Sequence, residues 1–431
     1  MESEHIRAEL RAFIVGDLLA GNAEGLEDDT PLLEWGIIES FSLVRLVNHI
    51  SHTFEVELPF SMITPKNFES VAAIAAAIAG ARAAVAPSGS APAHVEQRQA
   101  LVQGTPGVLD GFEWRPIPDQ APAADQIEIE VRAAGVNFRD VMIALGVYPE
   151  GGAVPGRPGE CAGVVRRTGS AQRSFAAGDE VVAIVDGDAH GAFADRVVTD
   201  ARLAARKPAE LSFAAAATLP IAFLTAHHAL RVLARIGSGE RVLVHSAAGA
   251  CGLAAVQLAL AAGAEVFATV GDPAKAATLA ALGVRHIFDN RSLAFADGVL
   301  AATSGRGVDI VLNSLPGPYI AKGLSLLAPF GRFVELGKTA IHANASIGLA
   351  PFRSNLSFFA IDLVPILRDR PGAVGDFLAM LMNDVRSGVF RPLPHTMFRF
   401  EDAAEALSCI ARRKNIGKIV LSTIHPQKGP Q

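Results

Sequence analysis

The chain has 431 residues, of which 50% are hydrophobic and 19% charged, and its formal net charge is −6. This length and apolar content predict two or three packed cores and exclude a disordered chain. Its three cysteines, Cys161, Cys251 and Cys409, are too few for a disulfide framework or a four-cysteine metal site. The chain also starts with Met1-Glu-Ser-Glu, which is unlike a signal peptide. The few cysteines and this start together favour a location in the reducing cytoplasm.

The charge is distributed unevenly along the chain. Residues 1–82 hold 13 acidic and 5 basic side chains, a net charge of −8, which leaves +2 for the remainder. This asymmetry could steer docking between the two parts, although a solvated acidic surface is the simpler interpretation. Nucleic acid binding is not indicated. The longest nearly apolar stretch, residues 211–226, contains Pro220 and is too short to span a membrane.

The first 82 residues carry apolar residues at helical spacing, which predicts a small all-α four-helix bundle. The repeating positions are Leu10, Phe13 and Ile14, then Leu43, Leu46, Val47, Ile50 and Phe54, and finally residues 71–78. Ser40 opens the second of these helices. Its hydroxyl can be a simple N-cap, or it can carry a phosphate, which the positive end of the helix favours.

Residues 83–100 are predicted to form a flexible linker, since Ala, Pro, Ser and Gly dominate them, as in Ala86-Pro-Ser-Gly-Ser-Ala-Pro-Ala93. A coil of this length has a root-mean-square span of roughly 20–25 Å and a full extension of roughly 60 Å. The first domain can therefore reach the second.

The remainder divides into a β-rich part and an α/β part. Residues 126–131 alternate between apolar and charged side chains, and short strands punctuated by Gly and Pro continue to about Lys207. From Arg241 onward, short apolar runs alternate with helical stretches, which predicts a doubly wound parallel sheet. The predicted strands are residues 242–245, 265–270, 308–312 and 332–336.

The stretch Ser246-Ala-Ala-Gly249-Ala-Cys-Gly252 lies between a predicted strand and a predicted helix, residues 253–262. Gly249 would let the backbone approach a pyrophosphate, and Gly252 would let the helix pack on the strand, while Ala247 replaces the first glycine of the usual motif. A tight structural turn is the alternative. The following strand-helix units favour dinucleotide binding.

The strand at residues 266–270 is not followed by the acidic residue that holds an NAD ribose. Lys275 and Arg291 lie nearby instead and suit the extra phosphate of NADPH. Asp272 could still accept a ribose hydroxyl, and Lys275 could be an ordinary solvated residue, so the pattern prefers NADPH without excluding NADH.

Residues 1–80 resemble acyl carrier proteins. The resemblance rests on Gly36-Ile-Ile-Glu-Ser-Phe41, on Phe54-Glu-Val-Glu-Leu-Pro59 and on Ile63-Thr-Pro-Lys-Asn-Phe68. In that family the serine of an Asp-Ser-Leu motif receives 4'-phosphopantetheine from a phosphopantetheinyl transferase. Here the motif is Glu39-Ser40-Phe41, and the resemblance implies that Ser40 is the attachment site.

Residues 101–425 resemble the enoyl reductases of polyketide and fatty acid synthases, which are zinc-free medium-chain dehydrogenases/reductases. The carrying stretches are Gly135 to Val141, Ala144 to Pro149, Gly178 to Val181, Leu219 to Ala226, His245 to Leu260, Arg306 to Leu315, Gly331 to Thr339 and Ile416 to Val420. The resemblance implies a GroES-like substrate domain in residues 101–225 and 346–425 and a Rossmann NADP-binding domain in residues 226–345. No cysteine–histidine set at ligand spacing occurs where zinc relatives bind the metal, so no metal is expected.

The resemblance also implies site residues. Cofactor contacts would come from Asn137, Ser246, Gly249, Gly252, Lys275, Arg291, Asn313, Gly337, Lys338 and Lys418. The proton donors proposed in the family match Lys275 and an acid after Arg291, where only Asp297 remains because Ala294 and Ala296 replace the usual acids. Tyr148 matches a position associated with the face of protonation, although packing is an equally good explanation.

We therefore expect an NADPH-dependent enoyl reductase acting on an acyl thioester carried at Ser40, with synthase components as partners and possible homodimers. The first rival is a quinone or alkenal reductase that acts on free small molecules. The second is a carrier or docking protein whose reductase has decayed, as Ala294, Ala296 and the altered Ala250-Cys251 turn suggest.

Overall fold

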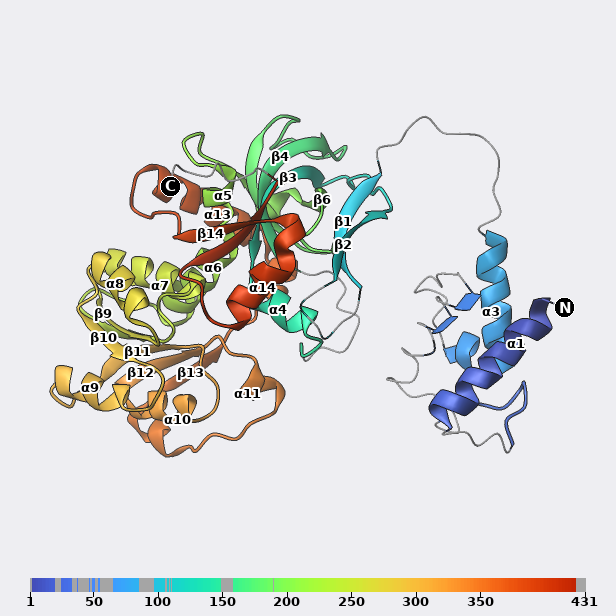
Figure 1. The fold of residues 1–431 in the computed structure, drawn as a ribbon. Coiled ribbons are helices and arrows are strands. Elements are labelled where there is room, and N and C mark those ends of the chain that lie inside the picture. The colour runs from blue at the N-terminus through green and yellow to red at the C-terminus, as the bar shows by residue number, and fades with distance from the viewer. Residues whose placement is uncertain are drawn as a thin grey trace, which may run out of the picture. The chain divides into compact units, whose positions relative to one another are not determined.

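The computed structural model describes residues 2–19, 25–32, 37, 46, 49–50, 53–54, 65–84, 97–104, 107, 109, 111–148, 158–188 and 190–423. The chain forms two compact units, Met1–Val95 and Glu96–Gln431. Figure 1 shows the fold of each. Ser40 lies outside the described residues.

The first unit is helical, as predicted. Its described elements are α1 (Glu2–Phe13), the π-helical turn η1 (Ile14–Leu18), the 3-10 turn η3 (Pro65–Phe68) and α3 (Val71–Ala84). Of the repeating apolar positions that the structure describes, Leu10, Ile14, Leu46, Ile50 and Phe54 are buried together. Arg7 and Arg11 both form ion pairs with Asp28 and so fix the segment after α1.

The linker prediction is wrong at both of its ends. Helix α3 continues through Ala84, and strand β1 (Arg98–Gln103) begins before residue 100. Arg98 is buried, donates to the Arg196 carbonyl at 2.6 Å and pairs with Asp188. These partners lie about a hundred residues further along the chain, so local composition could not reveal that Arg98 belongs to the folded domain.

The β-rich part contains a seven-stranded sheet and a hairpin. The sheet has the order β14-β15-β3-β4-β5-β7, with β6 paired to β3, and the hairpin joins β1 to β2. The bounds are β2 Phe112–Ile117, β3 Gln126–Val136, β4 Gly159–Thr168, β5 Glu180–Val185, β6 Arg196–Asp200, β7 Ala204–Arg206, β14 His395–Arg399 and β15 Lys418–Ser422. Strand β3 is central because it pairs with β15, β4 and β6, and it leads directly to Asn137.

The α/β part is a six-stranded parallel sheet with the order β10-β9-β8-β11-β12-β13, as a doubly wound fold requires. The strands are β8 Arg241–Val244, β9 Glu265–Val270, β10 His286–Asp289, β11 Val308–Asn313, β12 Leu327–Glu335 and β13 Ser357–Ala360. The prediction found the four central strands and missed the edge strands β10 and β13. Strand β13 also shows that residues 357–360 belong to the nucleotide-binding sheet, which corrects the domain boundary at 345.

Helices cover both faces of this sheet. Helices α7 (Ala250–Ala261) and α8 (Pro273–Ala281) pack on one face, and α9 (Phe295–Ala302) and α10 (Pro318–Ser325) on the other (Figure 1). Alternate residues of β8 and β9 enter the two cores: Val244 faces α7, and Phe267 faces α9. The sheet is therefore buried on both sides, as expected for parallel strands.

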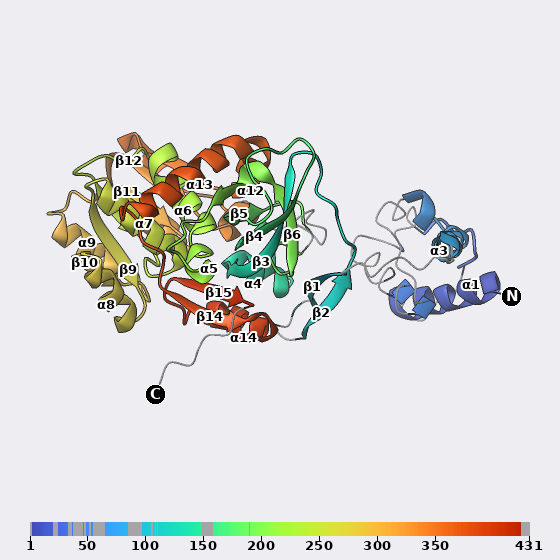
Figure 2. The same cartoon turned by 90° about the horizontal axis from the view of Figure 1, so that it is seen from above.

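The second unit contains further helices and helical turns. They are α4 Phe138–Ala144, η4 Ala201–Leu203, α5 Phe213–Ala216, α6 Pro220–His227, η5 His228–Leu233, α11 Thr339–His342, η6 Ala350–Ser354, α12 Leu363–Asp369, α13 Pro371–Arg386, η7 Phe400–Asp402 and α14 Ala403–Ala411. Helix α13 packs on α6, and α14 packs on α4 and lies beside β14 and β15 (Figure 2). The helical run Phe213–Leu233 is long and apolar enough to cross a membrane, but 72% of its apolar window is buried within the protein.

Candidate active site

The turn between β8 and α7 has the geometry of a phosphate-binding loop. Ser246 adopts a left-handed conformation with φ of 52°, and Gly249 precedes the first residue of α7. A β-carbon at Gly252 would lie 2.6 Å from the α-carbon of Ala247, so glycine allows the helix to pack against the turn. The amino end of a 12-residue helix therefore faces the carboxyl edge of the sheet, where backbone amides and the helix dipole favour a pyrophosphate.

Substitution of the two glycines by alanine should affect the stability of the protein differently. Gly252→Ala should destabilise the reductase unit by about 1–3 kcal/mol, because the new methyl group meets Ala247 backbone atoms. Gly249→Ala should change stability by less than about 0.5 kcal/mol. Its φ is −77° and its nearest neighbour would be the Ser246 oxygen at 3.4 Å. Thermal unfolding with and without cofactor measures the stability of each variant. Equal losses of stability in Gly252→Ala and Gly249→Ala would contradict the predicted difference.

A buried charged network lies beside this turn. Gly417 donates its amide to the Ala248 carbonyl at 2.8 Å, which brings the next residue, Lys418, to the loop. Lys418 is 1% exposed, donates to Asn137 Oδ1 at 2.6 Å and forms an ion pair with Glu160. The structure therefore brings together Asn137 and Lys418, two predicted site residues that are far apart in sequence.

Glu160 was not identified as a site residue from the sequence. It is fully buried, accepts from Asn137 Nδ2 at 3.0 Å and from the Ile221 amide at 2.8 Å, and pairs with Lys418. A single carboxylate within an apolar strand was the available signal, because such a group needs a buried partner. The network joins β4, α4, α6 and β15 at the cofactor turn.

The predicted phosphate-recognition residues lie at the carboxyl ends of β9 and β10. Arg291 is exposed and forms a bidentate ion pair with Asp289, with NH2 to Oδ2 at 2.5 Å. A β-carbon on Gly271 would lie 3.7 Å from Arg291 Cγ, so the two segments adjoin. Asp272 is the N-cap of α8 and accepts a hydrogen bond from the Ala274 amide at 2.7 Å. This capping role explains the presence of the carboxylate without a hydrogen bond to a ribose.

The predicted proton donors are not brought together. Lys275 lies on α8 and donates to the Arg413 carbonyl at 2.5 Å, and burial lowers its pKa. Asp297 is exposed in the first turn of α9, and α8 and α9 pack on opposite faces of the sheet. Tyr148 lies in the other domain, where the Arg139 guanidinium carbon is 4.7 Å from the centre of its ring.

The ends of β11 and β12 hold the other predicted cofactor residues. Asn313 is fully buried, and its amide donates to Glu335 Oε2 at 2.6 Å and to the Leu315 carbonyl at 2.9 Å. The Gly337 amide donates to Glu335 Oε1 at 2.6 Å. These contacts hold the turns after both strands, and the Glu335 carboxylate that joins them was missed by the sequence reasoning.

Two titratable groups next to this edge have unusual pKa values. Lys338 pairs with Asp362 at 2.5 Å; burial raises the pKa of Asp362, but Lys338 and the Val364 amide bring it below its usual value. His245, at the end of β8, bonds through Nδ1 to Thr269 Oγ1 at 2.9 Å. Burial lowers the pKa of His245 to about 4, so this imidazole is neutral at physiological pH.

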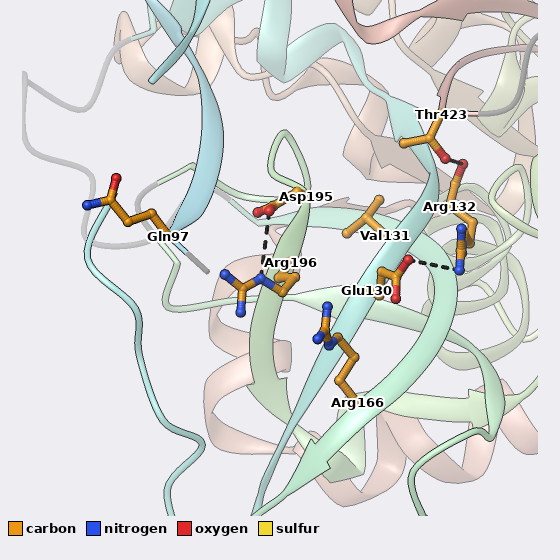
Figure 3. Close-up of a pocket in the computed structure, with 8 residues that line it drawn as sticks. All are labelled: Gln97, Glu130, Val131, Arg132, Arg166, Asp195, Arg196 and Thr423. Atoms are coloured by element: carbon orange, nitrogen blue, oxygen red, sulfur yellow. Dashed lines mark hydrogen bonds and ion pairs between the residues drawn. The ribbon is translucent and has the colours of Figure 1, made fainter. Parts of the chain in front are cut away.

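No metal-binding cluster marks this site among the residues described. No group of three or more His, Cys, Asp or Glu that could hold a metal occurs in those parts of the chain. Figure 3 shows a cavity, about 390 Å³ in volume, lined by residues of β3, β4 and β6 and by Gln97, Asp195 and Thr423. It contains none of the predicted site residues, and Glu130 pairs with Arg132 at 2.8 Å within it.

Three families of known domains match the chain. They are described as a phosphopantetheine attachment site over residues 12–78, an alcohol dehydrogenase GroES-like domain over residues 123–209, and a zinc-binding dehydrogenase over residues 282–421. The matched ranges follow the order carrier, β-rich domain, nucleotide-binding domain that the sequence predicts.

Solved structures and characterised proteins agree with these matches. The CurK enoyl reductase is 38% identical with a TM-score of 0.69, and the JamJ enoyl reductase 35% identical with a TM-score of 0.69; each match covers 76% of this chain and 99% of the other. A phenolphthiocerol/phthiocerol polyketide synthase protein of Mycobacterium tuberculosis is 42% identical over 325 residues, which is 75% of this chain. This chain matches only 15% of the length of that relative.

Proposed function

Because this chain belongs to the enoyl reductase family and also contains a phosphopantetheine attachment domain, we propose that it reduces a 2-enoyl thioester carried on Ser40 to the saturated acyl thioester with NADPH. The observation that carries the proposal is the presence of the prosthetic-group domain and of a reductase matched over its full length in one chain. The process would be the biosynthesis of a polyketide or fatty acid.

The residues at the cofactor turn have distinct roles in this proposal. The amino end of α7 binds the pyrophosphate, and Lys418, whose charge is balanced by Glu160, links β15 to this turn. Glu160 and Asn137 hold the lysine in position through the contacts described above. The bound cofactor supplies a hydride for the β-carbon of the enoyl thioester.

Tyr148 is the proton donor that we favour for the α-carbon. Lys275 and Asp297 cannot act as a pair, because they lie on helices at opposite faces of the sheet. The Arg139 guanidinium carbon lies 4.7 Å from the centre of the Tyr148 ring, and this cation–π contact helps to orient the phenol.

NADPH preference depends on Arg291 in this proposal. Arg291→Ala should raise the Kd for NADPH about 10- to 100-fold, since it removes charge-assisted hydrogen bonds to the 2'-phosphate. The Kd for NADH should stay within about twofold. Asp289→Asn is the matched control, because it releases Arg291 from its present ion pair without removing the cation. Fluorescence titration with both cofactors measures the change, and equal weakening of NADH would contradict the assignment.

The rival activity, reduction of free quinones or alkenals, differs in substrate. Consumption of NADPH at 340 nm should be faster with a crotonyl-pantetheine thioester than with free enones of the same length. A chain that reduces only the free enones would support the rival and overturn the thioester proposal.

The idea of a decayed reductase is weakened by the position of Ala296. This residue is 2% exposed within the apolar cluster around Phe295 and Val299, where an acidic side chain would be costly to bury. Alanine therefore fits the packing. Failure to bind NADPH in a fluorescence titration would nevertheless support a carrier without reductase activity.

The proposal includes partners. A phosphopantetheinyl transferase would modify Ser40, and other polyketide or fatty acid synthase components would supply the enoyl group and take the saturated product. We also propose a cytoplasmic location and a homodimer. Sedimentation of the purified chain tests the homodimer.

A further inference from the structure

Glu335 is a buried carboxylate at the carboxyl end of β12. It is 2% exposed, and its two oxygens accept from Asn313 Nδ2 and from the Gly337 amide, each at 2.6 Å. Both donors are neutral. The register places Glu335 between Asn313 on β11 and Ala360 on β13. It therefore has a neighbouring strand on each side at the carboxyl end of the sheet.

No cation compensates this carboxylate among the residues that the structure describes: no described Lys, Arg or His forms an ion pair with Glu335. Its neighbour Lys338 pairs with Asp362 instead. The equally buried Glu160, by contrast, has Lys418 as its partner. Burial raises the pKa of Glu335 to about 7, although Asn313 and Gly337 stabilise the charged form. A buried negative charge of this kind is costly unless a positive charge comes to it.

The position in the sheet indicates where such a charge would come from. In doubly wound folds a dinucleotide crosses the carboxyl edge where the strand order reverses, here between β8 and β11. The phosphate-binding turn follows β8, and Arg291 lies at the β10 side with the adenosine half. The nicotinamide half therefore falls on the β11–β12 side, where Glu335 ends its strand.

We propose that the Glu335 carboxylate is the counter-charge for the oxidised nicotinamide ring, so that it favours hydride donation and strengthens binding of the oxidised cofactor. This inference rests on the proposed function. When a hydride leaves with its electron pair for the β-carbon, the ring changes from neutral to positively charged, and a proton then reaches the α-carbon. Asn313 and Gly337 position the carboxylate, and Asn313 also forms hydrogen bonds with the Leu315 backbone.

The test is direct binding of both cofactor forms at pH 8.5, without substrate. Glu335→Gln should raise the ratio of the Kd for NADP+ to the Kd for NADPH roughly tenfold, the size of a charge interaction over a separation on the order of 10 Å at an effective dielectric constant of about 20. NADPH binding is followed by its fluorescence and NADP+ binding by competition. Glu265→Gln is the matched control, because Glu265 begins β9 at the opposite edge of the same sheet.

A second arm uses the unaltered protein and so does not depend on how the variant folds. At pH 5.5 the wild-type ratio should approach that of the Gln variant, because Glu335 is then protonated. The other titratable or charged groups on this edge and on the elements next to it are Lys338 and Asp362, already paired, the neutral His245, Tyr319 and Lys322 of α10, His342 of α11 and Arg353 of η6. The Gln variant keeps all of these, so a pH change that persists in it comes from them.

The outcomes separate the inference from the function. An unchanged ratio in Glu335→Gln, or a wild-type ratio that is constant between pH 5.5 and 8.5, would overturn the counter-charge. If neither cofactor form binds the wild-type chain, the proposed function itself is wrong.

Discussion

Ser40→Ala should abolish reduction of tethered substrate, because the hydroxyl that accepts the prosthetic group is removed. After incubation with a phosphopantetheinyl transferase and crotonyl-coenzyme A, the intact mass of the wild-type chain should increase by one acyl-phosphopantetheine group. The variant mass should not change. NADPH consumption from the loaded chain should fall to the background level, which is the largest loss of activity that we expect from one substitution.

The same variant should retain its activity on free crotonyl-pantetheine, since the reductase unit, Glu96–Gln431, is a separate compact body. Tethering raises the local substrate concentration to the millimolar range. The wild-type advantage should therefore disappear at millimolar free thioester. Equal turnover by both proteins after loading would mean that Ser40 does not deliver the substrate.

Lys418→Met should be the most destabilising single substitution near the cofactor turn. It leaves the fully buried Glu160 carboxylate without a cation, a defect that costs about 3–5 kcal/mol. Urea unfolding followed by circular dichroism should show this loss, and NADPH binding should weaken because the network that joins β15 to the cofactor turn is lost. The Met side chain fills similar space, so the loss reports on charge more than on a cavity.

Two further variants make this prediction specific. Arg241→Met breaks the ion pair between Arg241 and Glu265, and these side chains are 27% and 46% exposed, respectively. The substitution should lower the free energy of unfolding by less than about 1 kcal/mol. The double variant Glu160→Gln/Lys418→Met removes both buried charges and should recover much of the stability. If the double variant is as unstable as Lys418→Met, the unpaired carboxylate is not the cause.

The elements that the sequence predicts well are those with strong local patterns. The four central strands and the glycine turn were recognisable because buried parallel strands are continuous apolar runs and because Gly249 and Gly252 have a defined spacing. Strands β10 and β13 have only four residues each and lie at the sheet edges, where a short run is indistinguishable from a loop.

The site was predictable in its residues but not in its connections. Lys418 and Asn137 were identified by resemblance, yet their contact depends on β15 pairing with β3, which no local pattern encodes. Glu160 and Glu335 were missed because a carboxylate becomes conspicuous only when its burial is known. The Lys275–Asp297 pair was doubtful in sequence because Ala294 and Ala296 replace the usual acids, and the structure also places the two helices on opposite faces of the sheet.

The pairing of β15 with β3 has a consequence for biosynthesis. Val136 of β3 pairs with Ile419 of β15. Strand β3 therefore lacks this partner during synthesis until the ribosome has made the whole nucleotide-binding sheet and then β15. Such distant pairing slows folding and leaves an unpaired edge on the nascent chain. The demand for chaperones should therefore be highest until translation has passed Ser422. Strand β15 then completes the sheet, and Lys418 forms its contacts with Glu160 and Asn137.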